Sequence, residues 1–109
     1  VHLDAGRFRG AVFLRPESVA AMHAPRIATG TGAADGYGLT FGTDLHEGVR
    51  VVEHDGEGGW CTSQFLLVPD RGVGVIVLCN AYRADLTAAV ASHLLDWALD
   101  SEPKRQTGR

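Results

Sequence analysis

Two apolar segments joined by a turn signal constrain the fold more than any other feature of this sequence. They are Thr62–Val68 and Val73–Cys79, and the Pro-Asp-Arg-Gly between them is typical of a hairpin turn. The second segment is apolar at nearly every position, so we expect a strand that is covered on both faces. The hairpin predicts an antiparallel sheet with covering layers.

Helices and shorter strands are expected on either side of this hairpin. Pro16 suits a first helical turn and Pro25 forbids continuation, which predicts a short helix between them. The segment 26–36 is a loop by composition, Tyr37–Gly42 and Val49–His54 are predicted strands, and the segment 44–48 between them is a predicted turn. The pattern then becomes helical over Ala84–Leu99. Its expected core-facing stripe is Leu86, Val90, Leu94 and Trp97, with Ala89 and Ala98 beside it.

Length and charge exclude several classes of protein. The 109 residues suffice for one small domain, which we place at 1–100, followed by a polar tail at 101–109 that we expect to be disordered. A net charge of −3 argues against a nucleic-acid partner. No apolar run approaches the roughly 20 residues of a membrane helix, and no secretory signal is visible, which gives a weak preference for the cytoplasm and leaves the localisation open.

The two cysteines do not form a disulfide scaffold or a metal cluster. Cys61 and Cys79 lie almost opposite each other if the hairpin forms as predicted. A bridge between adjacent strands is sterically awkward, so we expect free thiols.

The expected elements leave one face of the sheet without a cover. The short helix that contains Glu17 is a poor candidate for a second covering layer. The sequence also starts at Val1 and has no methionine before Met22. We therefore expect a piece of a longer protein, with self-association through the exposed sheet face when the piece is alone.

Several features occur together in a recognisable order. They are Glu-Ser-Val-Ala-Ala-Met-His-Ala-Pro, then Tyr-Gly-Leu-Thr-Phe-Gly, then the long segment from Glu53 to Ala81 with its His-Asp-Gly triplet, Pro-Asp turn and closing Asn80. This ordered set resembles the C-terminal part of the serine β-lactamase-related family, which includes class C β-lactamases, penicillin-binding carboxypeptidases and esterases. The resemblance implies an α/β (α+β) fold, an antiparallel sheet with flanking helices, here the incomplete C-terminal portion of a β-lactamase/transpeptidase-like fold.

The resemblance also implies a site on the strand that carries the triplet. His54 would reach toward the acyl group of a small-molecule substrate, Gly56 would keep the strand open to close approach, and the main-chain N–H of Glu57 would be an oxyanion donor. An edge-strand N–H that is free of a neighbouring strand suits this role, because it can bind developing negative charge. The resemblance implies further substrate contacts at three positions, namely Asp55, Gly58 and Trp60. One departure is that Trp60 stands where family members often carry glycine, and Cys61 where they carry an aromatic residue.

The nucleophile of that family is absent from this chain. A Ser-x-x-Lys match occurs once, at Ser101 to Lys104, but it lies in the polar tail and contains Pro103. No Tyr-x-Asn motif occurs. A serine nucleophile needs an adjacent base, which the sequence does not identify for Ser18, Ser63 or Ser92. We expect the nucleophile to come from a missing N-terminal portion of the same fold, which is the expected partner.

Other interpretations remain open. A non-catalytic truncated product or binding module on the same scaffold is the main alternative, and a small metal or nucleotide binder is a minor one. The five histidines show no metal-ligand spacing, and the glycine-rich segments lack the complete phosphate-loop patterns, so no cofactor and no metal are expected. Asn80 is expected to cap the last helix, and without the resemblance His54 is a strand-terminal residue that bonds to backbone.

Overall fold

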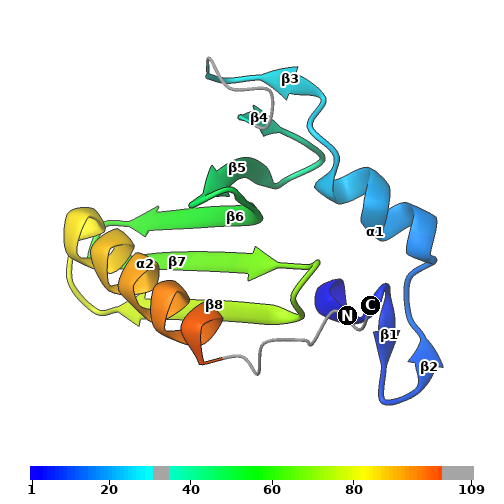
Figure 1. Ribbon diagram of the computed structural model, residues 1–109. Coiled ribbons are helices and arrows are strands. Elements are labelled where there is room, and N and C mark those ends of the chain that lie inside the picture. The colour runs from blue at the N-terminus through cyan, green and yellow to red at the C-terminus, as the bar shows by residue number, and fades with distance from the viewer. Residues whose placement is uncertain (31–34, 102–109) are drawn as a thin grey trace.

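A computed structural model describes residues 1–30 and 35–101 of the chain. Its centre is a six-stranded antiparallel sheet in the order β3-β4-β5-β6-β7-β8, so each strand pairs with its neighbours in sequence (Figure 1). The elements are the 3-10 helix η1 (His2–Asp4), β1 (Arg7–Phe8), β2 (Ala11–Val12), α1 (Pro16–His23), β3 (Ile27–Ala28), β4 (Gly36–Tyr37), β5 (Gly42–His46), β6 (Val49–Gly58), β7 (Cys61–Val68), β8 (Val73–Cys79) and α2 (Ala84–Asp100). The predicted antiparallel sheet with flanking helices is confirmed.

Helix α2 covers one face of the sheet, over β7 and β8 (Figure 1). Its buried side chains are Thr87, Ala91 and Leu95. They pack with residues of the three longest strands, and the buried members of this core are Val51, Leu66, Val68, Val75, Ala91 and Leu95. The core-facing stripe predicted from the sequence is therefore wrong, because Leu86, Val90, Leu94 and Trp97 are all exposed.

The opposite face of the sheet is covered only in part. Its core consists of Phe41, Val52 and Leu67, against which Leu3, Met22 and Phe65 pack. On β8 the same face carries Ile76 and Leu78, whose side chains are 64% and 79% exposed. The prediction that both faces of β8 are covered is therefore wrong for the described residues.

The predicted strand at Tyr37–Gly42 is instead a tight reversal between β4 and β5. Tyr37 pairs with Gly42, and the Gly38 N–H donates to the Phe41 carbonyl at 2.7 Å. A Cβ at Gly38 would lie 2.6 Å from the main-chain oxygens of Met22 and Ala24, so only glycine fits against the end of α1. Thr40 completes the turn with a φ of 72°. This close approach comes from the tertiary structure, which a local aromatic pattern does not reveal.

The bounds of other strands and turns also differ from those predicted. The turn predicted at 44–48 narrows to Glu47 and Gly48, both with positive φ, because β5 continues to His46. Strand β6 continues beyond the predicted end at His54 to Gly58, and the predicted loop 26–36 contains short β3. The rest of that loop, 31–34, and the tail from 102 lie outside the described residues.

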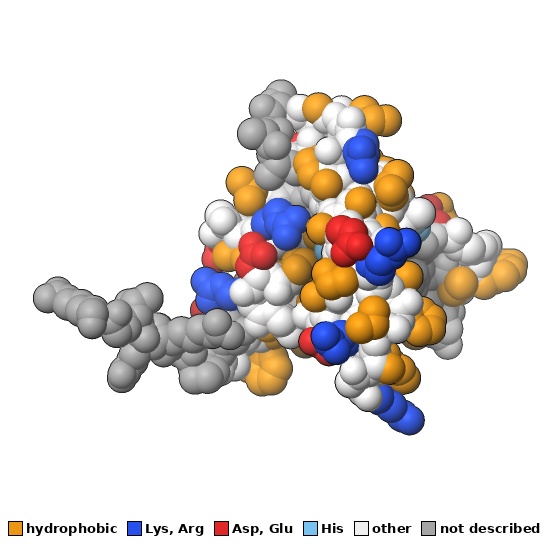
Figure 2. All heavy atoms as spheres, turned by 90° about the vertical axis from the view of Figure 1, so that its right-hand side faces the viewer, with side chains coloured by type: hydrophobic (Ala, Val, Ile, Leu, Met, Phe, Trp, Pro, Cys, Tyr) orange, Lys and Arg blue, Asp and Glu red, His pale blue; other side chains and the backbone are white. Residues whose placement is uncertain are grey.

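An aromatic cluster joins the N-terminal elements to the sheet. His23 at the end of α1 is 3% exposed, and its Nε2 lies 3.2 Å from Nδ1 of His2. Both rings pack on Phe41, with centroids 5.1 and 5.4 Å away. Figure 2 shows this end of the molecule, where hydrophobic and charged side chains are interspersed.

Candidate active site

The second half of β6 extends beyond its neighbour β5. The last β5–β6 pair is Gly42 with Glu53, whereas β6 continues to pair with β7 as far as Gly58 with Cys61. No described strand lies on the outer side of the segment 54–58. The His-Asp-Gly triplet thus occupies a free edge within an otherwise central strand.

The direction of the main-chain groups along this edge follows from the two hairpin turns of β6. Each turn has two residues, and the pairs that close them are His46 with Val49 and Gly58 with Cys61. A two-residue turn is closed by a hydrogen-bonded pair, and such pairs alternate along an antiparallel ladder. Both turns therefore direct the N–H groups of Asp55 and Glu57 to the free side. The Glu57 N–H has the direction that an oxyanion donor requires.

The His54 ring lies beside this free edge. Its Nδ1 is 2.5 Å from the main-chain oxygen of Asp55. A carbonyl only accepts hydrogen bonds, so Nδ1 carries the proton in this contact. Nε2 is then the ring nitrogen that is left to contact a reacting group. The contact also agrees with the backbone-bonded role expected for His54 without the resemblance.

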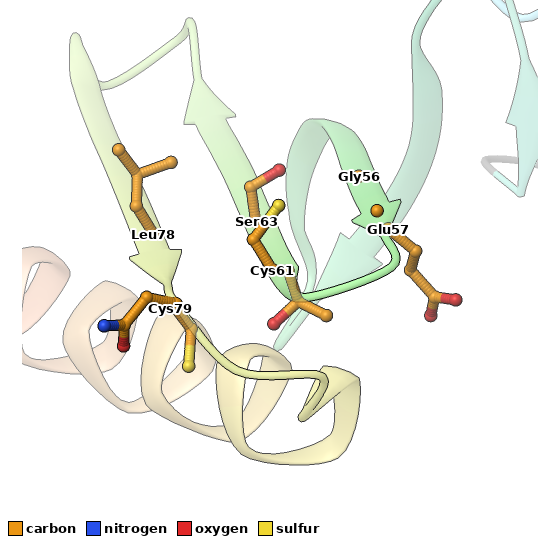
Figure 3. A pocket seen from close by; sticks show the side chains of 9 residues that line it. Gly56, Glu57, Cys61, Ser63, Leu78 and Cys79 are labelled. Carbon is orange, nitrogen blue, oxygen red and sulfur yellow. The ribbon is translucent and has the colours of Figure 1, made fainter.

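Two hollows lie on either side of the segment. One, of about 420 Å³, is lined by His54 and Asp55 together with residues of β4 and β5. The other, of about 660 Å³, lies over the β6–β7 hairpin and reaches Leu78 at the end of β8 (Figure 3). Gly56 and Gly58 line the second hollow, where the absence of side chains leaves its floor open.

The Glu57 carboxylate is bound by a residue that lies outside the sheet. Tyr82, in the connection between β8 and α2, donates a hydrogen bond from its hydroxyl to Glu57 Oε2 at 2.9 Å. This bond raises the pKa of Tyr82 above its ordinary value. The contact ties the hairpin to the start of α2. Tyr82 was missed by the sequence reasoning, and its Tyr-Arg-Ala context carries no signal that could have found it.

Glu53 and two nearby aspartates form an acidic cluster next to the free edge of β6. Burial raises the pKa of Glu53, and the nearby carboxylates of Asp44 and Asp55 raise it further. Negative charge that develops at the Glu57 N–H would be opposed by these carboxylates. The described residues therefore form an incomplete site for an anion.

The remaining predicted residues are at the tip and end of the hairpin. Trp60 is in the tip and is 88% exposed. Cys61 and Cys79 are free, as expected. Cys61 is paired with Gly58 and Cys79 with Thr62, which places them on opposite faces, with the Cys79 sulfur toward α2 (Figure 3). Asn80 does not cap α2, because the N-cap position is Arg83; it lines the larger hollow instead.

The described residues do not include an activated nucleophile. Ser63 lies opposite Gly56 and lines the larger hollow. Among the described residues, no hydrogen bond joins Ser18, Ser63 or Ser92 to a basic side chain. No group of three or more potential metal ligands occurs in the same part of the chain. No described helix is long and apolar enough to cross a bilayer.

The architecture has the fold of a penicillin-binding protein homologue. The solved structure of the octameric penicillin-binding protein homologue from Pyrococcus abyssi matches with a TM-score of 0.74 at 22% identity, over 96% of this chain and 23% of that chain. A curated relative, the unguisins hydrolase ungD′ of Aspergillus campestris, is 28% identical over 99 residues, which cover 85% of this chain and 18% of the relative. Both fit the serine β-lactamase-related family, and the resemblance predicted from the sequence is confirmed at this weak identity. The chain matches no protein-family model.

Proposed function

We propose that this chain is the C-terminal portion of a serine hydrolase of the β-lactamase-related family. In the complete protein, a serine from an N-terminal portion would attack an ester, amide or lactam carbonyl, and water would release the acid from the acyl-serine intermediate. The chain spans 18% of its curated relative and 23% of the solved homologue, so most of such a protein would lie outside it.

The free edge of β6 is the observation that carries this proposal. It combines three features within four residues, namely a histidine with an available Nε2, a glycine that permits close approach, and a main-chain N–H directed at open space. His54 would orient and stabilise the reacting group, and the Glu57 N–H would bind the developing oxyanion. Asp55, Gly58 and Trp60 would line the approach of the substrate.

The acidic residues around the free edge support a contribution of positive charge from another part of the complete protein. An acyl-transfer site must stabilise negative charge, and Glu53, Asp44 and Asp55 oppose it here. The missing portion would supply the nucleophile, its base and the positive charge that offsets these carboxylates.

A non-catalytic module on the same scaffold is the second candidate. The exposed position of Trp60 favours it. The two candidates differ in the length and reactivity of the native product.

The test is made on the native product from its source. An antibody against the 84–99 segment captures the product, and its intact mass is measured before and after a fluorophosphonate or a fluorescent penicillin is added. We expect a product several times longer than this chain and a single covalent adduct. A product of this length with no adduct would establish the non-catalytic module.

A pair of substitutions in the complete gene then tests the role of His54. We expect His54→Ala to slow acylation by about 100-fold, the range typical of a positioned acid–base group. His93→Ala, at an exposed position on α2, is the matched control and should leave the rate unchanged. Equal rates for the two variants would remove His54 from the mechanism.

A further inference from the structure

Glu57 carries the proposed oxyanion donor on a part of β6 that the sheet holds weakly. The alternation that directs its N–H to the free side directs its carbonyl there as well, so neither group takes part in the described β6–β7 ladder. Glycine stands on both sides of it, at 56 and 58, and glycine is the residue type with the most backbone freedom. The direction of this N–H therefore also depends on how the Glu57 side chain is held.

The connection between β8 and α2 contacts both Glu57 and its cross-strand partner. Glu57 is paired with Thr62, and paired residues direct their side chains to the same face of the sheet. The Tyr82 hydroxyl donates a hydrogen bond to Glu57 Oε2 at 2.9 Å. The Thr62 hydroxyl lies 3.3 Å from the carbonyl oxygen of Ala81. Two consecutive residues of the connection thus hold the two paired residues of the hairpin.

The connection is itself anchored by hydrogen bonds to two buried threonines. The hydroxyl oxygens of Thr62 and Thr87 are 2.6 Å apart, and both side chains are buried. Thr87 also donates to the Arg83 carbonyl at 2.9 Å. Tyr82 therefore lies between two residues, Ala81 and Arg83, whose carbonyls belong to this network. An anchored main chain on both sides lets the Tyr82 hydroxyl hold a side chain of the neighbouring hairpin in one place.

We propose that Tyr82 is a positioning residue for the oxyanion donor of the proposed hydrolase. Its hydrogen bond holds the Glu57 side chain near the start of α2, and the main chain of Glu57 then keeps its N–H directed at the reacting carbonyl. Tyr82 acts through Glu57 in this role. The inference rests on the proposed function, because the N–H has this role only in an acyl-transfer reaction.

The experiment is made on the complete protein, with para-nitrophenyl acetate as the substrate and the release of nitrophenolate as the measurement. In Tyr82→Phe we expect kcat to fall by about 5- to 10-fold with KM unchanged, because the N–H binds charge that develops only in the transition state. The matched control is Ser101→Ala, which removes an exposed hydroxyl that donates to the Trp97 carbonyl at the other end of α2. The control should leave kcat unchanged, and both variants should keep the melting temperature of the wild type.

Substitutions of Glu57 separate positioning from a general loss of structure. Glu57→Gln keeps an acceptor for the Tyr82 hydroxyl and should retain the kcat of the wild type. Glu57→Ala should lose as much as Tyr82→Phe, and the double variant should lose no more than either, because both changes remove the same contact.

Two results would overturn the inference while the proposed function stands. One is an active wild type in which Tyr82→Phe and Ser101→Ala have the same kcat, and the other is a double variant slower than both single variants. A complete protein that forms no acyl-serine intermediate would instead remove the proposed function, and the role of Tyr82 with it.

Discussion

His23 shows how a single buried side chain couples this fold to pH. The ring lies between α1 and the sheet, in contact with His2 and Phe41. Burial lowers the pKa of His23, and the charges of His2 and Arg50 lower it further. The pKa of His2 is lowered in the same way, first by burial and then by the terminal amine.

The sign of the pH dependence follows from these lowered pKa values. Below the ordinary histidine pKa of 6.5, the unfolded chain binds protons that the folded chain resists. We therefore expect the free energy of unfolding to fall as pH decreases from 7.5 to 5.5. The measurement is urea unfolding of the monomer at a series of pH values in this range.

The matched variant for this prediction is His23→Gln, which removes the titrating ring. Glu53 has a raised pKa, so its contribution favours the folded state at lower pH and runs in the opposite direction. This contribution cancels when wild type and variant are compared. Wild type should lose more stability than His23→Gln across the range, and parallel losses would contradict the prediction.

Some residues of the candidate site can be predicted from the sequence, and others cannot. The His-Asp-Gly triplet places His54 and Gly56 close together on one strand whatever the rest of the fold does. The Tyr82–Glu57 hydrogen bond joins residues 25 positions apart, and it exists only because α2 begins beside the hairpin. The direction of the Glu57 N–H likewise depends on where β5 ends.

Among the elements, α2 shows what hydrophobic periodicity predicts and what it does not. Its existence and its bounds, Ala84–Asp100, are nearly those predicted. The side that faces the sheet was wrong, because two apolar strips are present and the smaller side chains, Thr87 and Ala91, are the ones that allow close packing. Thr87 is buried despite its hydroxyl because that group bonds to the Arg83 carbonyl and to Thr62.

Two substitutions on α2 test which strip stabilises the fold. Leu95 is fully buried, so Leu95→Ala should cost about 2–5 kcal/mol of unfolding free energy. Leu94→Ala removes the same atoms from a partly exposed side chain and should cost less than about 1 kcal/mol. Chemical unfolding at concentrations where the chain is monomeric provides both values. A larger loss of unfolding free energy in Leu94→Ala than in Leu95→Ala would show that the strip predicted from the sequence is the one that faces the core.

The hairpins were predicted best among the elements. Strands β7 and β8 agree with the predicted ranges to within one residue, since the turn chemistry and the apolar runs are local signals. Strands β4 and β5 were not separated, because the reversal at Gly38 is determined by contact with the end of α1.

For the whole molecule, the two faces of the sheet are unequal. One has a continuous core beneath α2, whereas the other leaves Ile76 and Leu78 exposed. The sequence predicts the apolar strand and an uncovered face of the sheet, but not which side chains of β8 stay exposed. The pattern of expected elements itself predicts a missing covering layer, and the resemblance adds that an N-terminal portion of the same fold would supply it.

The exposed face should bind a hydrophobic dye in the folded state. We expect anilinonaphthalene sulfonate to fluoresce with the native chain, and Leu78→Lys to lower that fluorescence without changing the melting temperature, because Leu78 is 79% exposed. The control is Leu45→Lys, which replaces another exposed leucine by lysine and should have little effect on the fluorescence. Equal fluorescence from both variants would show that the dye binds elsewhere.

The contact between Leu3 and Gly74 has a consequence for the order of folding during synthesis. A Cβ at Gly74 would lie 3.3 Å from the Leu3 side chain, so the first turn of the chain rests on its last strand. Strands β6 to β8 and α2 are consecutive and contact one another, so this portion needs only itself to close its core. The segment 1–14 emerges from the ribosome before β8, but the surface on which Leu3 packs is incomplete until β8 has formed. The segment 1–14 should therefore complete its native contacts only after strands that are synthesised later than itself.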